Sequence, residues 1–157
     1  MDGTKIAMVV CVGVGLALAS GAAGCGTPAV PVNDHDVVAS VDVEWSNLGG
    51  AHHYGESSCP QNVGSILLTN TGTVATSVDV TETASQLHLL RVASSGSASP
   101  FTGPVTLAPG ESLELRVEFD CTMTVDIATN IHVTATPTGG TADSLDIPFM
   151  LDIQGAP

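Results

Sequence analysis

Basic residues are scarce in this chain. Three lysines and arginines stand against sixteen aspartates and glutamates, which gives a formal net charge of −13 at pH 7. Proteins that bind nucleic acid rely on Lys and Arg to displace the counterions of the phosphate backbone. The shortage of these residues therefore excludes nucleic acid as a partner, and it predicts a well-solvated, acidic surface.

Aromatic residues are also few, at 3% of the chain, so the core has to be built from Val, Leu and Ile. Val and Thr, which are plentiful, favour strands because a branched Cβ fits a pleated sheet. Gly and Pro divide such strands with turns. No long helical pattern and no internal repeat is present. With 157 residues, the chain is expected to form a single all-β domain once any processed segment is removed.

The apolar run at the N-terminus is too short for a confident membrane span. Residues 6–19 are uncharged and rich in glycine, whereas a spanning helix needs about 20 apolar residues. The run has the length of the hydrophobic region of a secretory signal, and the small residues 20–24 follow it. We therefore expect residues 1–24 to be a signal peptide.

The signal ends in Ala22-Ala23-Gly24-Cys25, which resembles the lipobox of bacterial lipoproteins and departs from it at Ala22, where that family has Leu. In that family the cysteine is lipidated and becomes the first residue after cleavage. The resemblance implies a protein of the bacterial cell envelope, anchored to the membrane by lipid on Cys25 and facing the periplasm or the cell surface. Several acyl chains anchor a protein stably, whereas one alone is marginal. The alternative is an ordinary exported protein in which Cys25 has no role.

Only four cysteines are present, and Cys11 and Cys25 belong to the signal and its end. The two that remain, Cys59 and Cys121, lie in a chain expected to be exported, where cysteines pair. A disulfide between them closes a loop of about 60 residues and contributes about 4 kcal/mol by the chain-entropy estimate. Two free thiols are the alternative. A zinc site is less favoured because neither cysteine has a second one at the usual close spacing.

Alternation of apolar and polar residues predicts about seven antiparallel strands and a β-sandwich. Residues 25–36, with two prolines and no periodicity, are expected to be the lipidated cysteine and an extended tether, so the domain covers residues 37–157. Residues 83–93 fit either a strand or one helical turn, and residues 94–104 are expected to form a loop. The clearest strand patterns lie in residues 37–45, 63–70, 74–82, 107–119, 129–137 and 144–153.

Two motifs occur in order within these strands: a strand ending in Asn-x-Gly, and a Leu-x-Pro-Gly turn that opens a strand ending in Phe. The residues that carry them are Asn70, Gly72, Leu107, Pro109, Gly110 and Phe119. Together they resemble the immunoglobulin-like domains of the ASPM–SPD-2–Hydin group over about residues 63–133, with Cys121 where that family has a closing proline. The resemblance implies an immunoglobulin-like sandwich with a structural or protein-contact role, an unidentified envelope protein as partner, and no catalytic residues.

No catalytic motif is evident: the sequence lacks a Gly-x-Ser-x-Gly elbow, a phosphate-binding loop and a His-Glu-x-x-His helix. We therefore predict a non-enzymatic protein that needs no cofactor. Calcium at residues 33–36 is disfavoured, because calcium requires six or more oxygens in a fixed cage. His88 and His132 are expected to face solvent.

The residues of most chemical interest are His52 and His53, on a segment that runs to Cys59. Imidazole is a good ligand for zinc or copper, so the alternative function is a metal-binding lipoprotein that uses this loop. Adjacent residues of a strand face opposite ways, so joint ligation requires a loop or a partner chain. The simpler interpretation is a polar surface loop held by Cys59.

Overall fold

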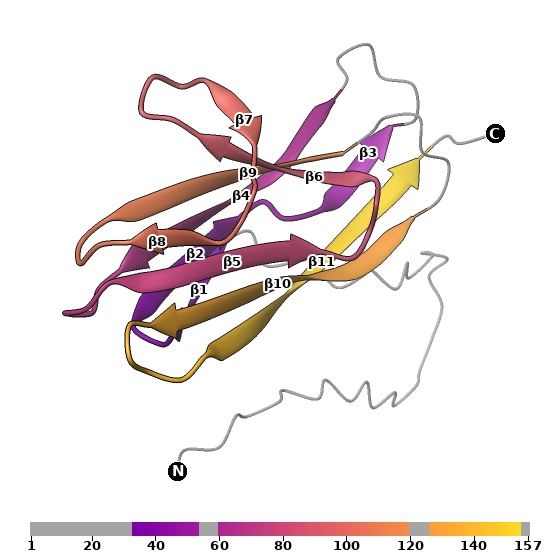
Figure 1. Ribbon diagram of the computed structural model, residues 1–157. Coiled ribbons are helices and arrows are strands. Elements are labelled where there is room, and N and C mark those ends of the chain that lie inside the picture. Colours follow the sequence, from indigo (N-terminus) through magenta and orange to yellow (C-terminus); the bar gives the residue numbers. More distant parts are fainter. Residues whose placement is uncertain (1–32, 54–59, 120–125, 155–157) are drawn as a thin grey trace, which may run out of the picture.

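The computed structural model describes residues 33–53, 60–119 and 126–154 (Figure 1). These residues form eleven strands arranged as two facing sheets, which is an immunoglobulin-like β-sandwich. The all-β, immunoglobulin-like prediction is therefore confirmed. Within the described ranges, no helix has the length and apolar character needed to cross a membrane.

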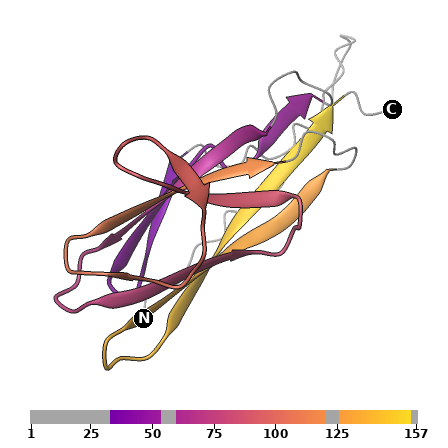
Figure 2. The same cartoon turned by 45° about the horizontal axis from the view of Figure 1, so that its top comes forward.

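Sheet A has six strands in the order β1-β2-β4-β9-β6-β7, and sheet B has five in the order β3-β11-β10-β5-β8. All neighbouring strands pair antiparallel except β3 and β11, which are parallel. The turns β4–β5, β8–β9 and β10–β11 gather at one end of the sandwich, and β3 and β11 end at the other (Figure 2). The strands are β1 (Asn33–Val38), β2 (Val41–Ser46), β3 (Gly50–His53), β4 (Gln61–Asn70), β5 (Thr76–Glu82), β6 (Leu87–Val92), β7 (Ala98–Pro100), β8 (Val105–Leu107), β9 (Ser112–Phe119), β10 (Ile127–Pro137) and β11 (Asp143–Gln154).

The core lies between the two sheets and is aliphatic, as the composition predicts. On β9, which lies in the predicted strand pattern at 107–119, the alternate residues Leu113, Leu115, Val117 and Phe119 are each at most 2% exposed. Phe149 on β11 packs into the same core from the opposite sheet. Each fully buried side chain of this kind contributes about 1.5–3 kcal/mol relative to an exposed one. The period-two pattern places these apolar side chains between the sheets, and their burial stabilises the packing of one sheet on the other.

Residues 37–45 form a hairpin rather than the single strand that was predicted. Ala39 and Ser40 have φ values of +46° and +67°, which make the two-residue turn between β1 and β2. The turn puts Val38 in the core and leaves Val37 57% exposed, whereas one alternating strand over residues 37–45 would place Val37 on the same face as Val41 and Val43. Because β1 begins at Asn33, residues 33–36 belong to sheet A and not to the predicted tether.

The remaining differences concern short strands at sheet edges. Residues 83–93, which fitted either a strand or a helical turn, contain β6, and the predicted loop at 94–104 contains β7. β3, β7 and β8 have three or four residues each, too few to show a period, and with the β1–β2 hairpin they raise the count above the predicted seven. Val74 is 45% exposed because β5 begins only at Thr76.

Candidate functional site

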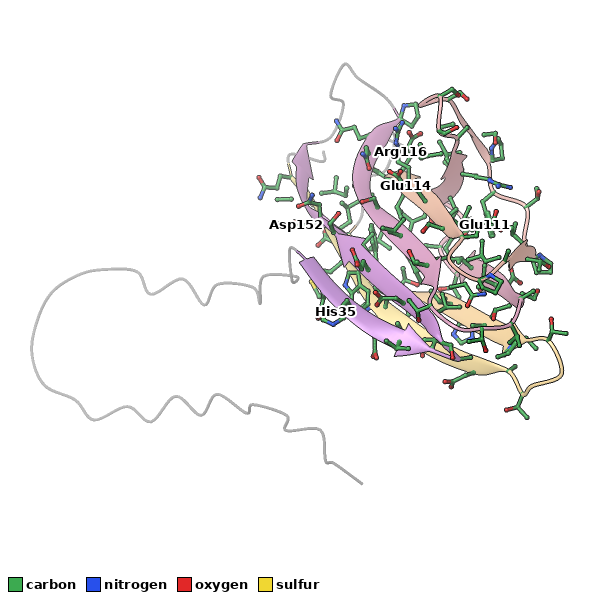
Figure 3. The ribbon with its side chains drawn as sticks, turned by 90° about the vertical axis from the view of Figure 1, so that its left-hand side faces the viewer. His35, Glu111, Glu114, Arg116 and Asp152 are labelled. Carbon is green, nitrogen blue, oxygen red and sulfur yellow. The ribbon has the colours of Figure 1, made fainter. Side chains whose placement is uncertain are left out.

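The outer face of sheet A is hollowed over strands β1, β2, β4 and β9. The depression has a volume of about 650 Å³ and is named the acidic hollow here. It is lined by Asp34, His35, Asp42, Glu44, Trp45, Ser46, Ser65, Leu67 and Glu114. In Figure 3, His35 lies on β1 at one side of this face and Glu114 on β9 at the other, with β2 and β4 between these strands in the sheet.

The strand register brings the hollow's residues together from distant parts of the sequence. His35 lies opposite Glu44, Glu44 opposite Leu67, and Leu67 opposite Glu114. Side chains of directly opposed residues stand on the same face of a sheet. The alternation that buries Val41, Val43 and Trp45 therefore turns the acidic residues between them outward.

The carboxylates of the hollow have no basic partner within the described residues. Arg116, the nearest basic residue on β9, forms an ion pair with Glu118 at 3.6 Å. Glu44 and Glu114 are exposed and stand two strands apart, roughly 10 Å, so salt screens much of their mutual repulsion. The hollow therefore presents uncompensated negative charge to the solvent, which attracts positively charged partners.

The floor of the hollow differs chemically from its rim. Leu67 is half-buried at its centre, and the Ser46 and Ser65 hydroxyls are hydrogen-bonded to each other at 2.8 Å at one side. One carboxylate oxygen of Asp42 is buried and has no hydrogen-bond partner among the described residues. In the part of the chain that the structure describes, no three His, Cys, Asp or Glu side chains are placed to hold a metal ion. A floor that combines one apolar side chain with polar groups, inside a charged rim, suits contact with another protein.

His52 and His53 form the end of β3, opposite Ile153 and Gln154 of β11. The loop that was predicted for them is therefore wrong for these two residues, and their side chains lie outside the described part of the structure. Cys25, Cys59 and Cys121 also lie outside the described residues, so lipidation and the disulfide stay predictions. The described strands give one observation relevant to the disulfide. Gln61 of β4 lies opposite Phe119 of β9. In the sequence, Cys59 is two residues before Gln61, and Cys121 is two residues after Phe119.

The structure adds a partner for His132 that the sequence analysis missed. Nδ1 of His132 is 2.6 Å from Oδ1 of Asp146, its opposite residue on β11. The sequence held a signal for this pair, because both residues lie seven positions from Gly139 in the β10–β11 turn. The His132 side chain is 45% exposed, as predicted for a solvent-facing residue, and His88 is exposed as well.

The His132–Asp146 pair matches two parts of a hydrolase triad, in which a carboxylate orients an imidazole. A triad also needs a nucleophile hydrogen-bonded to the imidazole. Thr81 is the opposite residue of His132 on β5, but the described side chains show no hydrogen bond between them. With both partners about half exposed or more, the pair is a surface contact of sheet B.

No family model and no curated protein sequence matches this chain. Among solved structures, it is similar to the ASH/PapD-like domain 7 of human CEP192, with 14% identity, a TM-score of 0.48, and 76% of this chain and 89% of that one covered. It is also similar to the YadV chaperone, with 10% identity, a TM-score of 0.46 and coverages of 74% and 53%. The periplasmic chaperone SfaE follows with 18% identity, a TM-score of 0.41 and coverages of 73% and 57%.

The chain spans little more than half the length of the two chaperones. All three TM-scores lie below 0.5 and all identities below 25%. The assignment of the fold therefore rests on the two sheets and their register.

Proposed function

We propose that this chain is a lipid-anchored protein of the bacterial cell envelope whose immunoglobulin-like domain contacts another envelope protein and catalyses no reaction. The acidic hollow is the observation that carries this proposal. Its unpaired carboxylates Asp42, Glu44 and Glu114 surround half-buried Leu67. The partner that fits is a surface with lysines or arginines around one apolar side chain, because opposite charges steer association and apolar burial holds it.

The anchor part of the proposal is supported by the sequence around Cys25. Residues 26–32 separate that cysteine from the start of β1. Seven residues reach at most about 25 Å when fully extended. The domain is then held close to the membrane surface, within reach of other membrane-anchored proteins.

Site-specific cross-linking in cells tests the contact. A photoreactive amino acid is placed at Leu67 of the full chain, and at Thr134, which is half-buried on β10 in sheet B, as the matched control. We expect one discrete adduct from position 67 and none from 134. The adduct should weaken severalfold in Glu44→Lys and Glu114→Lys backgrounds, since each reverses a rim charge. The proposal is contradicted if no adduct forms at position 67, or if the yield of the adduct is the same in both charge-reversal variants as in the wild type.

The metal-binding alternative is less favoured by the strand that His52 and His53 end. Successive residues of a strand alternate between its faces, so joint ligation there requires a partner chain.

A further inference from the structure

His35 stands on the rim of the acidic hollow, at the end of a row of residues that crosses sheet A. The strand register places it opposite Glu44, and beyond Glu44 the row continues with Leu67 and Glu114. Directly opposed residues of an antiparallel pair have Cβ atoms about 4.5–5.5 Å apart on the same face. His35 is exposed, and Figure 3 shows it on β1 at the border of the hollow. Its imidazole is therefore within reach of the Glu44 carboxylate.

The charged residues around His35 in the described structure are acidic. From β2, Glu44 lies directly opposite and Asp42 lies at a diagonal position, and both line the hollow. On β1 itself, Asp34 and Asp36 flank His35 from the opposite face of the strand, and the Asp34 carboxylate accepts from the backbone N–H of His35 at 2.9 Å. β11 also contacts β1, and its charged residues are all aspartates. A proton on His35 therefore adds a positive charge among carboxylates.

His35 and Glu44 are not joined by a hydrogen bond or an ion pair in the described structure, and Glu44 is exposed. The Glu44 carboxylate is thus free to meet a basic group of a partner. The same chain shows how a histidine pairs across one strand spacing: Nδ1 of His132 lies 2.6 Å from Oδ1 of Asp146, its opposite residue on β11. A protonated His35 has the equivalent position relative to Glu44.

We propose that protonation of His35 weakens the binding of a basic partner at the acidic hollow, so that this contact responds to pH. The inference rests on the proposed function, because it concerns the regulation of the same site. Histidine is the side chain that ordinarily gains its charge between about pH 5 and pH 8, whereas ordinary carboxylates titrate mostly below about pH 5. Protonated His35 pairs with Glu44 and repels the partner's cation.

The direction of the response follows from the charges. When His35 is neutral, the hollow keeps its full negative charge and the partner binds most tightly. When His35 is protonated, one positive charge stands at the rim, and an exposed pair of this kind changes affinity by roughly two- to fivefold. Because the partner prefers the deprotonated form, its binding must in turn release a proton from His35 at intermediate pH.

Cross-linking from position 67 in isolated cell envelopes, buffered at about pH 8 and at about pH 5.5, tests the proposal. In the chain with His35 intact, we expect the adduct yield to fall roughly two- to fivefold at the lower pH. His35→Gln keeps a polar side chain that takes up no proton, so its yield should be equal at both pH values. His88→Gln is the matched control, because His88 is exposed on β6 outside the hollow, and it should keep the full response.

A synthetic peptide with one leucine between two lysines provides a second measurement, on the full chain in solution. Calorimetry at about pH 6.5, in two buffers of different ionisation enthalpy, measures the protons released when the peptide binds. We expect net release from the wild-type chain and none from His35→Gln. His35→Arg carries the positive charge permanently, so it should bind the peptide roughly two- to fivefold more weakly than His35→Gln at both pH values used for cross-linking.

Equal adduct yields at the two pH values in the chain with His35 intact overturn this proposal and leave the proposed contact standing. A fall in yield that persists in His35→Gln also overturns it, because the responding group then lies elsewhere. Equal proton release from the wild-type chain and His35→Gln leads to the same conclusion. If no adduct forms at either pH, the proposed contact is itself wrong, and this inference is wrong with it.

Discussion

Asn70 holds together the two turns that carry the sequence motifs. The residue is fully buried, and its Nδ2 donates to the C=O groups of Val74 at 2.8 Å and Leu107 at 3.0 Å. Its Oδ1 accepts from the N–H of Gly72 at 3.0 Å. One amide thus satisfies three backbone groups from both turns. This is the physical reason why the two motifs, more than thirty residues apart, occur together.

Asn70→Asp should destabilise the protein strongly, because a carboxylate would face two carbonyl oxygens in the interior. We expect the free energy of unfolding to fall by about 3 kcal/mol in urea titrations of the full chain. Asn62→Asp is the matched control on the same strand: Asn62 is exposed and its Oδ1 accepts from the N–H of Gly64 at 3.0 Å, a role that a carboxylate retains. That change should cost no more than about 0.5 kcal/mol. Equal losses in both variants would contradict the role given to Asn70.

The histidine pair at the end of β3 provides a second test at single residues. Since strand residues alternate between faces, we expect Zn²⁺ titrated into the wild-type chain and into a His52→Ala/His53→Ala variant to give the same weak heats by calorimetry. Tight binding that disappears in the double variant would restore the metal-binding alternative.

Among the strands, those with long alternating patterns were predictable and the short ones were not. β4, β9, β10 and β11 bury one face against the core, so their sequences carry the period. The β1–β2 turn was missed because its two residues with positive φ are Ala39 and Ser40, whereas Asn, Asp and Gly are the usual residues of such turns. The acidic hollow depends on which strands become neighbours. That information is spread over the whole chain and shows in no local pattern.

β1 is an edge strand of sheet A, and the N–H groups of His35 and Val37 on its free side donate to the carboxylates of Asp34 at 2.9 Å and Asp36 at 2.7 Å. This capping leads to a prediction about self-association. Asp34→Ala with Asp36→Ala exposes the N–H groups of His35 and Val37 and removes two negative charges. We expect this variant to sediment as a dimer at concentrations where the wild type is monomeric. Glu44→Ala with Glu114→Ala removes the same charge from β2 and β9, two interior strands of sheet A, and should remain monomeric. Dimers of both variants would assign the effect to net charge and not to the edge.

The pairing of β4 with β9 supports the predicted disulfide. Gln61 lies opposite Phe119, and Cys59 and Cys121 are each two residues further along the sequence from this pair, so a β4–β9 pairing that extended by two residues would place them opposite each other. We expect mass spectrometry of unreduced protein to find these cysteines linked, and Cys59→Ser to lower the free energy of unfolding by about 4 kcal/mol. Cys11→Ser, in the predicted signal, should leave stability unchanged. Alkylation of both cysteines in freshly isolated protein would show two free thiols instead.

For the molecule as a whole, charge and anchoring act in opposite directions. A net charge of −13 repels anionic lipid headgroups, so electrostatic attraction to a membrane surface contributes nothing to retention. The proposed attachment therefore depends on lipid at Cys25 alone.

We expect Cys25→Ser to move the protein from the membrane pellet to the soluble fraction even at low salt, while Cys11→Ser stays in the pellet. A Cys25→Ser protein that still sediments with membranes would show that another part of the chain, or a membrane-bound partner, retains it. Repeating the fractionation with Glu44→Lys and Glu114→Lys separates those two cases, because only retention by a basic partner in the acidic hollow is lost when its rim charges are reversed.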